Sequence, residues 1–196
     1  GGVWNALTHL DWTTYFETLP AHIFDISLSL EADRMSNSQF ESQEVERERT
    51  VVISEREGNE NQPLFLLAEA VQTEAFSQHP YQHEVIGVKD DLLTITRDDL
   101  YHHYRRFYQP ANAVLAIAGD FETKDMLERI DQIFGKIPAG ESIDHTLPLE
   151  PPQAGEKRVN VSGPGETSFV QIAYHAPSAS NPNFFTLTVL DSLLTG

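Results

Sequence analysis

Cysteine is absent from all 196 residues, which excludes disulfides, thiol nucleophiles and cysteine-ligated zinc sites. Long apolar runs are absent too: none approaches the ~20 residues that cross a bilayer, so no membrane insertion is expected in this segment. The opening residues GGVWN lack the basic and apolar regions of a signal peptide. We expect an internal piece of a longer protein, for which the sequence predicts no compartment.

Positive charge is scarce. Lys and Arg number 13 against 30 Asp and Glu, a formal net charge of −17. Phosphate backbones and anionic membranes select basic surfaces, so the charge argues strongly against nucleic acid as a partner and also against anionic membranes. Two interpretations stay open, a basic or neutral peptide as partner and simple solubility. The chain is 40% apolar, which is enough for a folded core.

Hydrophobic periodicity predicts both helices and strands. Without strict βαβ alternation, the order of elements favours an α+β fold with a mainly antiparallel sheet and helices packed on one face. The proline- and glycine-rich stretch 138–157 is the best linker candidate. Helices are predicted over 22–35, 38–57, 64–76, 96–108, 123–134 and 184–194, and strands within 3–16 and over 113–118, 159–162 and 169–175.

Carboxylates line one face of the helix predicted around residue 50. Glu55 follows the apolar residues 51–53, which would turn it toward the interior, where an acid needs a cation, a donor or a metal. The alternative is a solvated acidic face with Arg47 and Arg49 as partners, and spacing alone favours this alternative. The acids that share the face at about 3.6 residues per turn are Glu41, Glu44, Glu48 and Glu55.

The eight histidines form no recognisable metal motif. His79 and His83 are four residues apart, but Pro80 between them makes a helical metal-binding pair poor. The sequence contains no zincin motif, P-loop, nucleophile elbow or EF-hand, and no Ser, His and Asp grouping suggests a triad.

The N-terminal residues offer a second candidate site. Gly1 and Gly2 precede a strand that carries Asn5 and Ala6, and glycines there permit close approach of another backbone. An extended peptide could pair with such a strand edge. The alternative is an ordinary tight turn into an interior strand.

Several segments, in this order and spacing, resemble the pitrilysin/insulinase family of zinc metallopeptidases, which includes the mitochondrial processing peptidases. The resemblance spans nearly the whole chain and rests on the order of the segments rather than on any single motif. They read GGVWNALTHLDWTTY, ERERTVVISEREGNENQP, AFSQHPYQHEVIG, LTITRDDLYHHYRRFYQPANAVLAIAGDFE, FGKIP and LEPPQAGEKRV.

The resemblance implies roles for particular residues. The family holds zinc (Zn2+) with two histidines of an HxxEH motif, whose glutamate activates the zinc-bound water, and with a later glutamate that matches Glu55. A second glutamate, seven residues earlier, supports the catalytic site and matches Glu48. Seven helical residues span ~10.5 Å, so the two acids could not both ligate one ion unless the helix breaks. Asn5 and Ala6 match the strand that holds an extended peptide substrate.

HxxEH occurs nowhere in these residues, and the family pattern would place it just upstream of Gly1. We therefore expect part of a zinc metalloendopeptidase that is inactive by itself. The alternative is a non-catalytic partner or scaffold subunit of the same fold.

The resemblance also implies a pitrilysin-like architecture, an α+β metalloenzyme fold with a ferredoxin-like repeat. Residues 1–140 would be the remainder of an N-terminal peptidase domain, 141–158 a linker, and 159–196 the start of a second homologous domain without zinc. The implied partners are a peptide substrate and, beyond it, a paired homologous subunit or a second copy in a homodimer.

Overall fold

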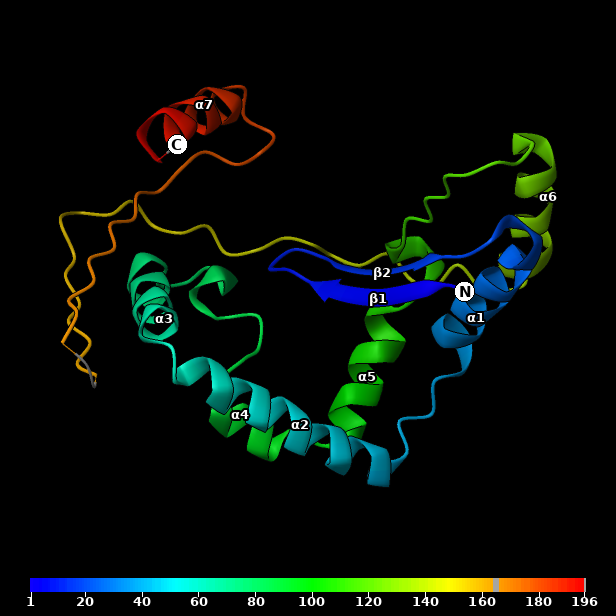
Figure 1. The fold of residues 1–196 in the computed structure, drawn as a ribbon, viewed down its shortest axis with the longest axis horizontal. Coiled ribbons are helices and arrows are strands. Elements are labelled where there is room, and N and C mark those ends of the chain that lie inside the picture. Colours follow the sequence, from blue (N-terminus) through cyan, green and yellow to red (C-terminus); the bar gives the residue numbers. More distant parts are fainter. Residues whose placement is uncertain (164–165, 196) are drawn as a thin grey trace. The chain divides into compact units, whose positions relative to one another are not determined.

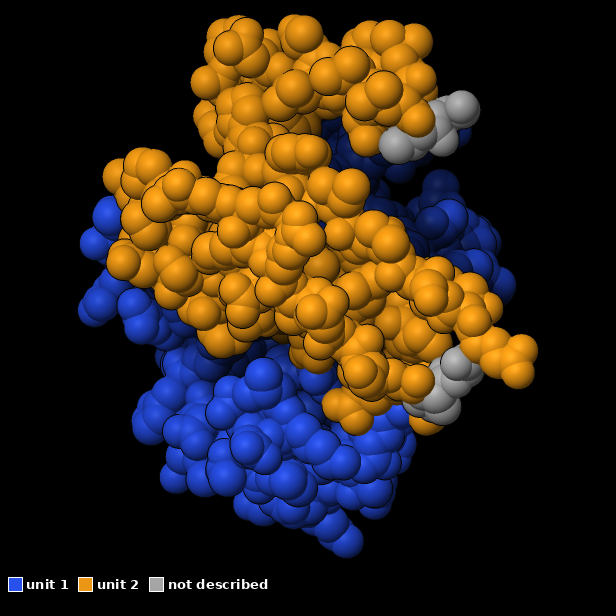
Figure 2. All heavy atoms as spheres, turned by 90° about the vertical axis from the view of Figure 1, so that its left-hand side faces the viewer, with its two compact units in different colours: residues 1–57, 85–146 blue, residues 58–84, 147–196 orange. Residues whose placement is uncertain are grey.

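The computed structural model describes residues 1–163 and 166–195. The chain divides into two compact units, one of residues 1–57 and 85–146 and the other of residues 58–84 and 147–196 (Figure 2). The regular elements in Figure 1 are β1 (Val3–Thr8), β2 (Thr13–Thr18), α1 (Phe24–Asn37), α2 (Ser42–Glu60), α3 (Pro63–Ala75), α4 (Lys89–Thr94), α5 (Arg97–Phe107), α6 (Thr123–Phe134) and α7 (Asn183–Thr195). Short 3-10 turns occupy Ala21–Ile23, Pro80–Gln82 and Pro110–Asn112.

Local sequence signals account for the helix ends. Pro63 opens α3, where its missing N–H costs nothing. Thr96 caps α5 in a capping box, since its hydroxyl accepts from the Asp99 N–H while the Asp99 carboxylate accepts from the Thr96 N–H. All six predicted helices are confirmed, with ends that differ by a few residues.

The break between α1 and α2 has a conformational cause. Phe40 has φ 52°, in the left-handed region that non-glycine residues seldom adopt, and α2 therefore starts at Ser42 rather than at residue 38. Arg97 holds this connection by donating to the carbonyls of Phe40 at 3.0 Å and Gln39 at 2.7 Å.

Tyr104 of α5 is the best buried aromatic side chain in the first unit, with 3% of its surface exposed. Its hydroxyl donates to the Arg34 carbonyl and accepts from the Ser38 N–H, which ties α5 to the end of α1. The hydroxyls of Tyr15 and Tyr108 lie 2.8 Å apart and link β2 to the residue after α5. Buried apolar side chains are few among the described residues: Leu28, Val45, Tyr104 and Met126.

The second unit is organised around the C-terminal end of α3. Lys157 donates to the Glu74 carbonyl, and the His175 ring lies 2.8 Å from the Ala75 carbonyl oxygen. The Glu150 carboxylate accepts from the backbone of residues 77–79. The segment that carries Glu150 and Lys157 is thus docked on α3 although it has no regular secondary structure.

The sheet is smaller than predicted. β1 and β2 form a two-stranded antiparallel sheet, so the described residues give a helix-rich α+β arrangement. The strands predicted over 113–118, 159–162 and 169–175 are wrong, because no described segment pairs with them and strands need ladder partners. Val114 is 95% exposed, the opposite of the buried central strand that its apolar neighbours predicted. None of the helices in the described part of the chain has the length and apolar character of a membrane span.

Candidate functional site

Helix α2 carries the candidate site and has two distinct faces. It is unbroken from Ser42 to Glu60, so Glu48 and Glu55 stand about two turns apart on one rod. The packed face repeats at spacings of four, three and four residues, the pattern of a helix lying against another element. Its members are Val45, Arg49, Val52 and Arg56.

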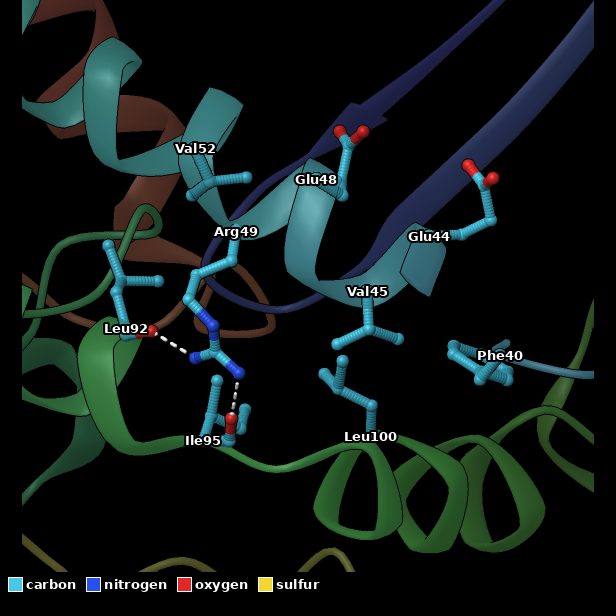
Figure 3. A pocket seen from close by; sticks show the side chains of 9 residues that line it. All are labelled: Phe40, Glu44, Val45, Glu48, Arg49, Val52, Leu92, Ile95 and Leu100. Carbon is cyan, nitrogen blue, oxygen red and sulfur yellow. Dashed lines mark hydrogen bonds between the residues drawn. The ribbon is translucent and has the colours of Figure 1, made fainter. Parts of the chain in front are cut away.

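Glu48 and Glu55 each precede a member of the packed face, which places them about 100° around the helix from it. Figure 3 shows the carboxylates of Glu44 and Glu48 directed away from the side where Val45 meets Leu100. Glu55 is exposed as well, so the expectation that it turns inward is wrong. Arg56 takes the inward place, with 6% of its surface exposed.

Some of the acids of α2 have local partners. Glu44 pairs with Arg47 at 3.1 Å, as the solvated-face interpretation expects, and both side chains are more than 60% exposed. Arg49 pairs with Glu46, and this hydrogen-bonded guanidinium holds the pKa of Glu46 below its ordinary value. Within the described ranges, the side chains of Glu48 and Glu55 have no hydrogen-bond or ion-pair partner.

A cavity of about 430 Å³ opens beside the packed face (Figure 3). Its wall is mainly apolar, and the guanidinium of Arg49 reaches through it to the backbone carbonyls of Leu92 and Ile95. The lining residues are Phe40, Glu44, Val45, Glu48, Arg49, Val52, Leu92, Ile95 and Leu100.

The side chains that could coordinate zinc show whether the chain can hold this ion. Zinc accepts carboxylate oxygen, and catalytic sites use three protein ligands with one open position. The unpartnered Glu55 carboxylate fits the part of one such ligand. Among the residues that the structure describes, however, no three His, Asp or Glu side chains come together as a metal site.

The second candidate site, at Asn5 and Ala6, lies on strand β1. Ala6 stands opposite Tyr15, and the His9 N–H donates to the Trp12 carbonyl at 2.8 Å. Antiparallel pairs alternate between bonded and non-bonded, so the backbone groups of Ala6 face the open edge of β1. The Ala6 N–H is met there by the Asn5 side-chain oxygen at 2.8 Å.

Comparison with known proteins identifies the family. Residues 94–196 match the family model described as peptidase M16 inactive domain, and residues 1–89 match the one described as insulinase (peptidase family M16). The chain belongs to peptidase family M16, which confirms the resemblance to the insulinase-type peptidases.

The relatives are named as proteases. Zinc protease PqqE of Helicobacter pylori is 30% identical over 198 residues, 99% of this chain and 45% of that protein. "Probable mitochondrial-processing peptidase subunit beta, mitochondrial" of Arabidopsis thaliana is 25% identical over 99% of this chain and 37% of its own length. The crystal structure of a protease from Helicobacter pylori superposes with a TM-score of 0.68 at 31% identity, covering 76% of this chain and 36% of that one. The chain thus spans less than half the length of these relatives.

The sequence argument missed the function of two arginines in the packed face. The sequence pattern predicts Arg49 as a partner for acids and gives no role to Arg56. A usable signal was present, because both occupy the inward positions of a regular spacing that Val45 and Val52 define.

Proposed function

We propose that the chain is part of a zinc-dependent endopeptidase that hydrolyses peptides bound in extended form, and that it is inactive by itself. Glu55 provides one zinc ligand and Glu48 supports the catalytic site. The observation that carries the proposal is the pair of exposed, unpartnered carboxylates seven residues apart on an unbroken helix. The zinc proteases among the relatives support it.

The chemistry that bound zinc supplies in hydrolysis is polarisation of the scissile carbonyl and a lowered pKa of its water. The chain contributes the carboxylate of Glu55 as ligand, held on a rigid helix rather than on a loop. Glu48, about 10.5 Å along the helix, acts through neighbouring groups or substrate. The open edge of β1 at Ala6 offers backbone groups to an extended peptide, in the manner of strand addition.

The proposal includes a larger assembly around this chain. Residues 1–140 form the remainder of the zinc-binding domain, 141–158 the linker, and 159–196 the start of a second domain. In the whole protein, a mainly antiparallel sheet has helices packed on one face. A homologous subunit or a second copy is the partner beyond the peptide substrate.

A second candidate function is a non-catalytic partner or scaffold subunit of the same fold. The match of residues 94–196 to the inactive-domain model favours it. The two candidates differ in one sequence feature, the presence of HxxEH upstream of Gly1 in the whole protein. Its absence there would exclude the enzyme.

Substitution of the two acids in the whole protein tests the assigned roles. Glu55→Gln is expected to lose zinc, because a direct ligand is removed. Glu48→Gln is expected to keep most zinc and to lower peptide cleavage by about 10–100-fold, the usual effect of a residue that supports ligands. Metal analysis and a cleavage assay measure both, with Glu44→Gln, one turn away on the same face, as control. Equal zinc in both variants, or zinc lost only from Glu48→Gln, would overturn the assignment.

A further inference from the structure

The packed face of α2 contains two arginines where apolar residues are usual. Val45 and Val52 share the face with them, and the Arg49 side chain is only 14% exposed while Arg56 is buried. A buried guanidinium is costly unless its donors are used. The acceptors of these two arginines therefore identify the segment against which this face of α2 packs.

Both arginines donate to backbone carbonyls of one segment, residues 87–95. Arg49 Nη1 donates to Leu92 O and Nη2 to Ile95 O, each at 2.5 Å (Figure 3). Arg56 Nη1 donates to Gly87 O at 2.7 Å. α4 ends at Thr94, so Leu92 lies in its last turn and Ile95 directly follows it. Carbonyls at this end of a helix lack helical donors, and a cation is favourable there.

Glu46 holds Arg49 from the other side. Its two carboxylate oxygens accept from Nε at 3.2 Å and from Nη2 at 3.1 Å. The Glu46 carboxylate thus holds the guanidinium plane from α2, while Nη1 and Nη2 also donate to the carbonyls of Leu92 and Ile95. Such a forked contact has a geometry that a lysine ammonium cannot reproduce.

We infer that Arg49 and Arg56 are positioning residues that set the rotation of α2 about its axis and so direct the face that carries Glu48 and Glu55. The bonds of Arg49 and Arg56 to the segment 87–95, here called the arginine contacts, lie about two turns apart and prevent rotation of α2 about its axis. Each of the two arginines directly follows one of the acids in sequence. The role of the acids in this inference rests on the proposed function, whereas the arginine contacts do not.

Because the chain has no cysteine, the position of α2 relative to α4 can be measured with two introduced spin labels. Val51 on α2 and Leu93 on α4 are exposed, so Val51→Cys with Leu93→Cys gives two unique sites for spin labels. Arg49→Met is expected to broaden the distance distribution between the labels, and Arg49→Lys to restore it in part. Arg47→Met is the matched control, because Arg47 lies on the same helix and, among the described residues, its side chain pairs only with exposed Glu44. If the distance distribution between the labels is unchanged in both Arg49→Met and Arg56→Met, the two arginines do not fix the rotation of α2.

The effect on function is measured in the whole enzyme. Arg49→Met and Arg56→Met are expected to weaken zinc binding and lower kcat by about 10–100-fold, with KM changed less than about twofold. In Glu48→Gln the further loss caused by Arg49→Met is expected to be smaller, because residues that act together are not additive. A broadened distribution with unchanged zinc affinity and kcat would overturn the positioning role. Zinc retained by Glu55→Gln would instead overturn the proposed function. The label distances would still show whether Arg49 and Arg56 fix the rotation of α2.

Discussion

Two carboxyl groups meet between β2 and α1. Glu31 hydrogen-bonds to Glu17, which also accepts from the Ser27 hydroxyl at 3.1 Å. Burial and the neighbouring Glu17 raise the pKa of Glu31 to about 7, although Arg34 lies 2.9 Å from it and opposes the rise. Because two like charges so close are unfavourable, the Glu31 carboxyl keeps its proton to a higher pH than an ordinary glutamate does.

This carboxyl pair makes folding stability depend on pH. The pKa of Glu31 is raised in the folded chain, so its stabilising contribution is complete below about 4.5 and is lost as pH rises through about 7. Glu31→Gln, which is always neutral, is expected to flatten the melting temperature between pH 5 and 8. At pH 8 it is expected to melt about 1–3 °C above the unmodified chain, a small shift because the group is partly solvated.

Thermal melts of both chains across this pH range give the measurement. Glu128→Gln, an exposed acid on α6, shows how much of any change follows from net charge alone. If Glu31→Gln and Glu128→Gln shift the curve equally, the raised pKa of Glu31 is not the cause of the pH dependence.

At the scale of elements, helices were predictable because their signals are local. Pro63 and the Thr96 capping box stand within a few residues of the ends that they define. The structure of residues 113–118 was not predictable, because an apolar run forms a strand only where another strand lies beside it. β1 and β2 were found for the opposite reason, since a hairpin brings its own partner.

The candidate site was predictable to a similar degree. The seven-residue spacing of Glu48 and Glu55 placed them on one helical face, and the helix is continuous. Their exposure was not predictable from the neighbouring apolar residues, because the inward direction is set by Arg49 and Arg56. The carbonyls that these arginines bind lie more than 30 residues away in sequence, and only the fold brings them together.

A second element-scale feature is the docking of the connecting segment by Glu150. Its Oε1 accepts from the Ser77 N–H at 2.8 Å and the Ser77 hydroxyl at 2.6 Å, and its Oε2 accepts from the N–H groups of Gln78 and His79 at 2.9 and 3.0 Å. The Ser77 hydroxyl above all, then the backbone donors, lower the pKa of Glu150 to about 2. The contribution of this contact to stability is therefore present above about pH 4.5 and is lost as pH falls through about 2.

Replacing Glu150 is expected to release the segment around it. Glu150→Gln turns an amide group toward backbone donors, so faster hydrogen exchange is expected at the amides of 77–79, together with faster proteolysis of 147–158. Glu156→Gln is the control, because Glu156 is exposed and pairs with Arg158 nearby. Equal protection in the two variants would mean that Glu150 does not hold the segment. No release is expected on lowering pH from 7 to 5.

For the whole molecule, the balance of charge is consistent with how the arginines are used. The chain has 13 basic residues against 30 acidic ones, and Arg49, Arg56 and Arg97 all donate to backbone carbonyls. Cations bonded in this way stabilise the fold, and Arg49 and Arg97 also pair with one exposed acid each, Glu46 and Asp98. The remaining negative charge favours solubility and attraction of basic peptides, and it disfavours nucleic acid.

The charge also makes zinc binding by the chain alone a discriminating test. Many carboxylates attract divalent cations weakly, but tight binding needs three or four ligands fixed around one point. The described residues hold no group of three such side chains, and Glu55 offers one carboxylate. Calorimetric titration is therefore expected to show no one-to-one site tighter than about 10⁻⁵ M, a limit set by comparison with the far tighter structural zinc sites. Glu55→Gln is expected to leave the titration of the isolated chain unchanged, whereas in the whole protein the same substitution is expected to remove zinc. A tight one-to-one isotherm would contradict this prediction, and loss of that isotherm on replacing His79 or His83 would place the site in the second unit.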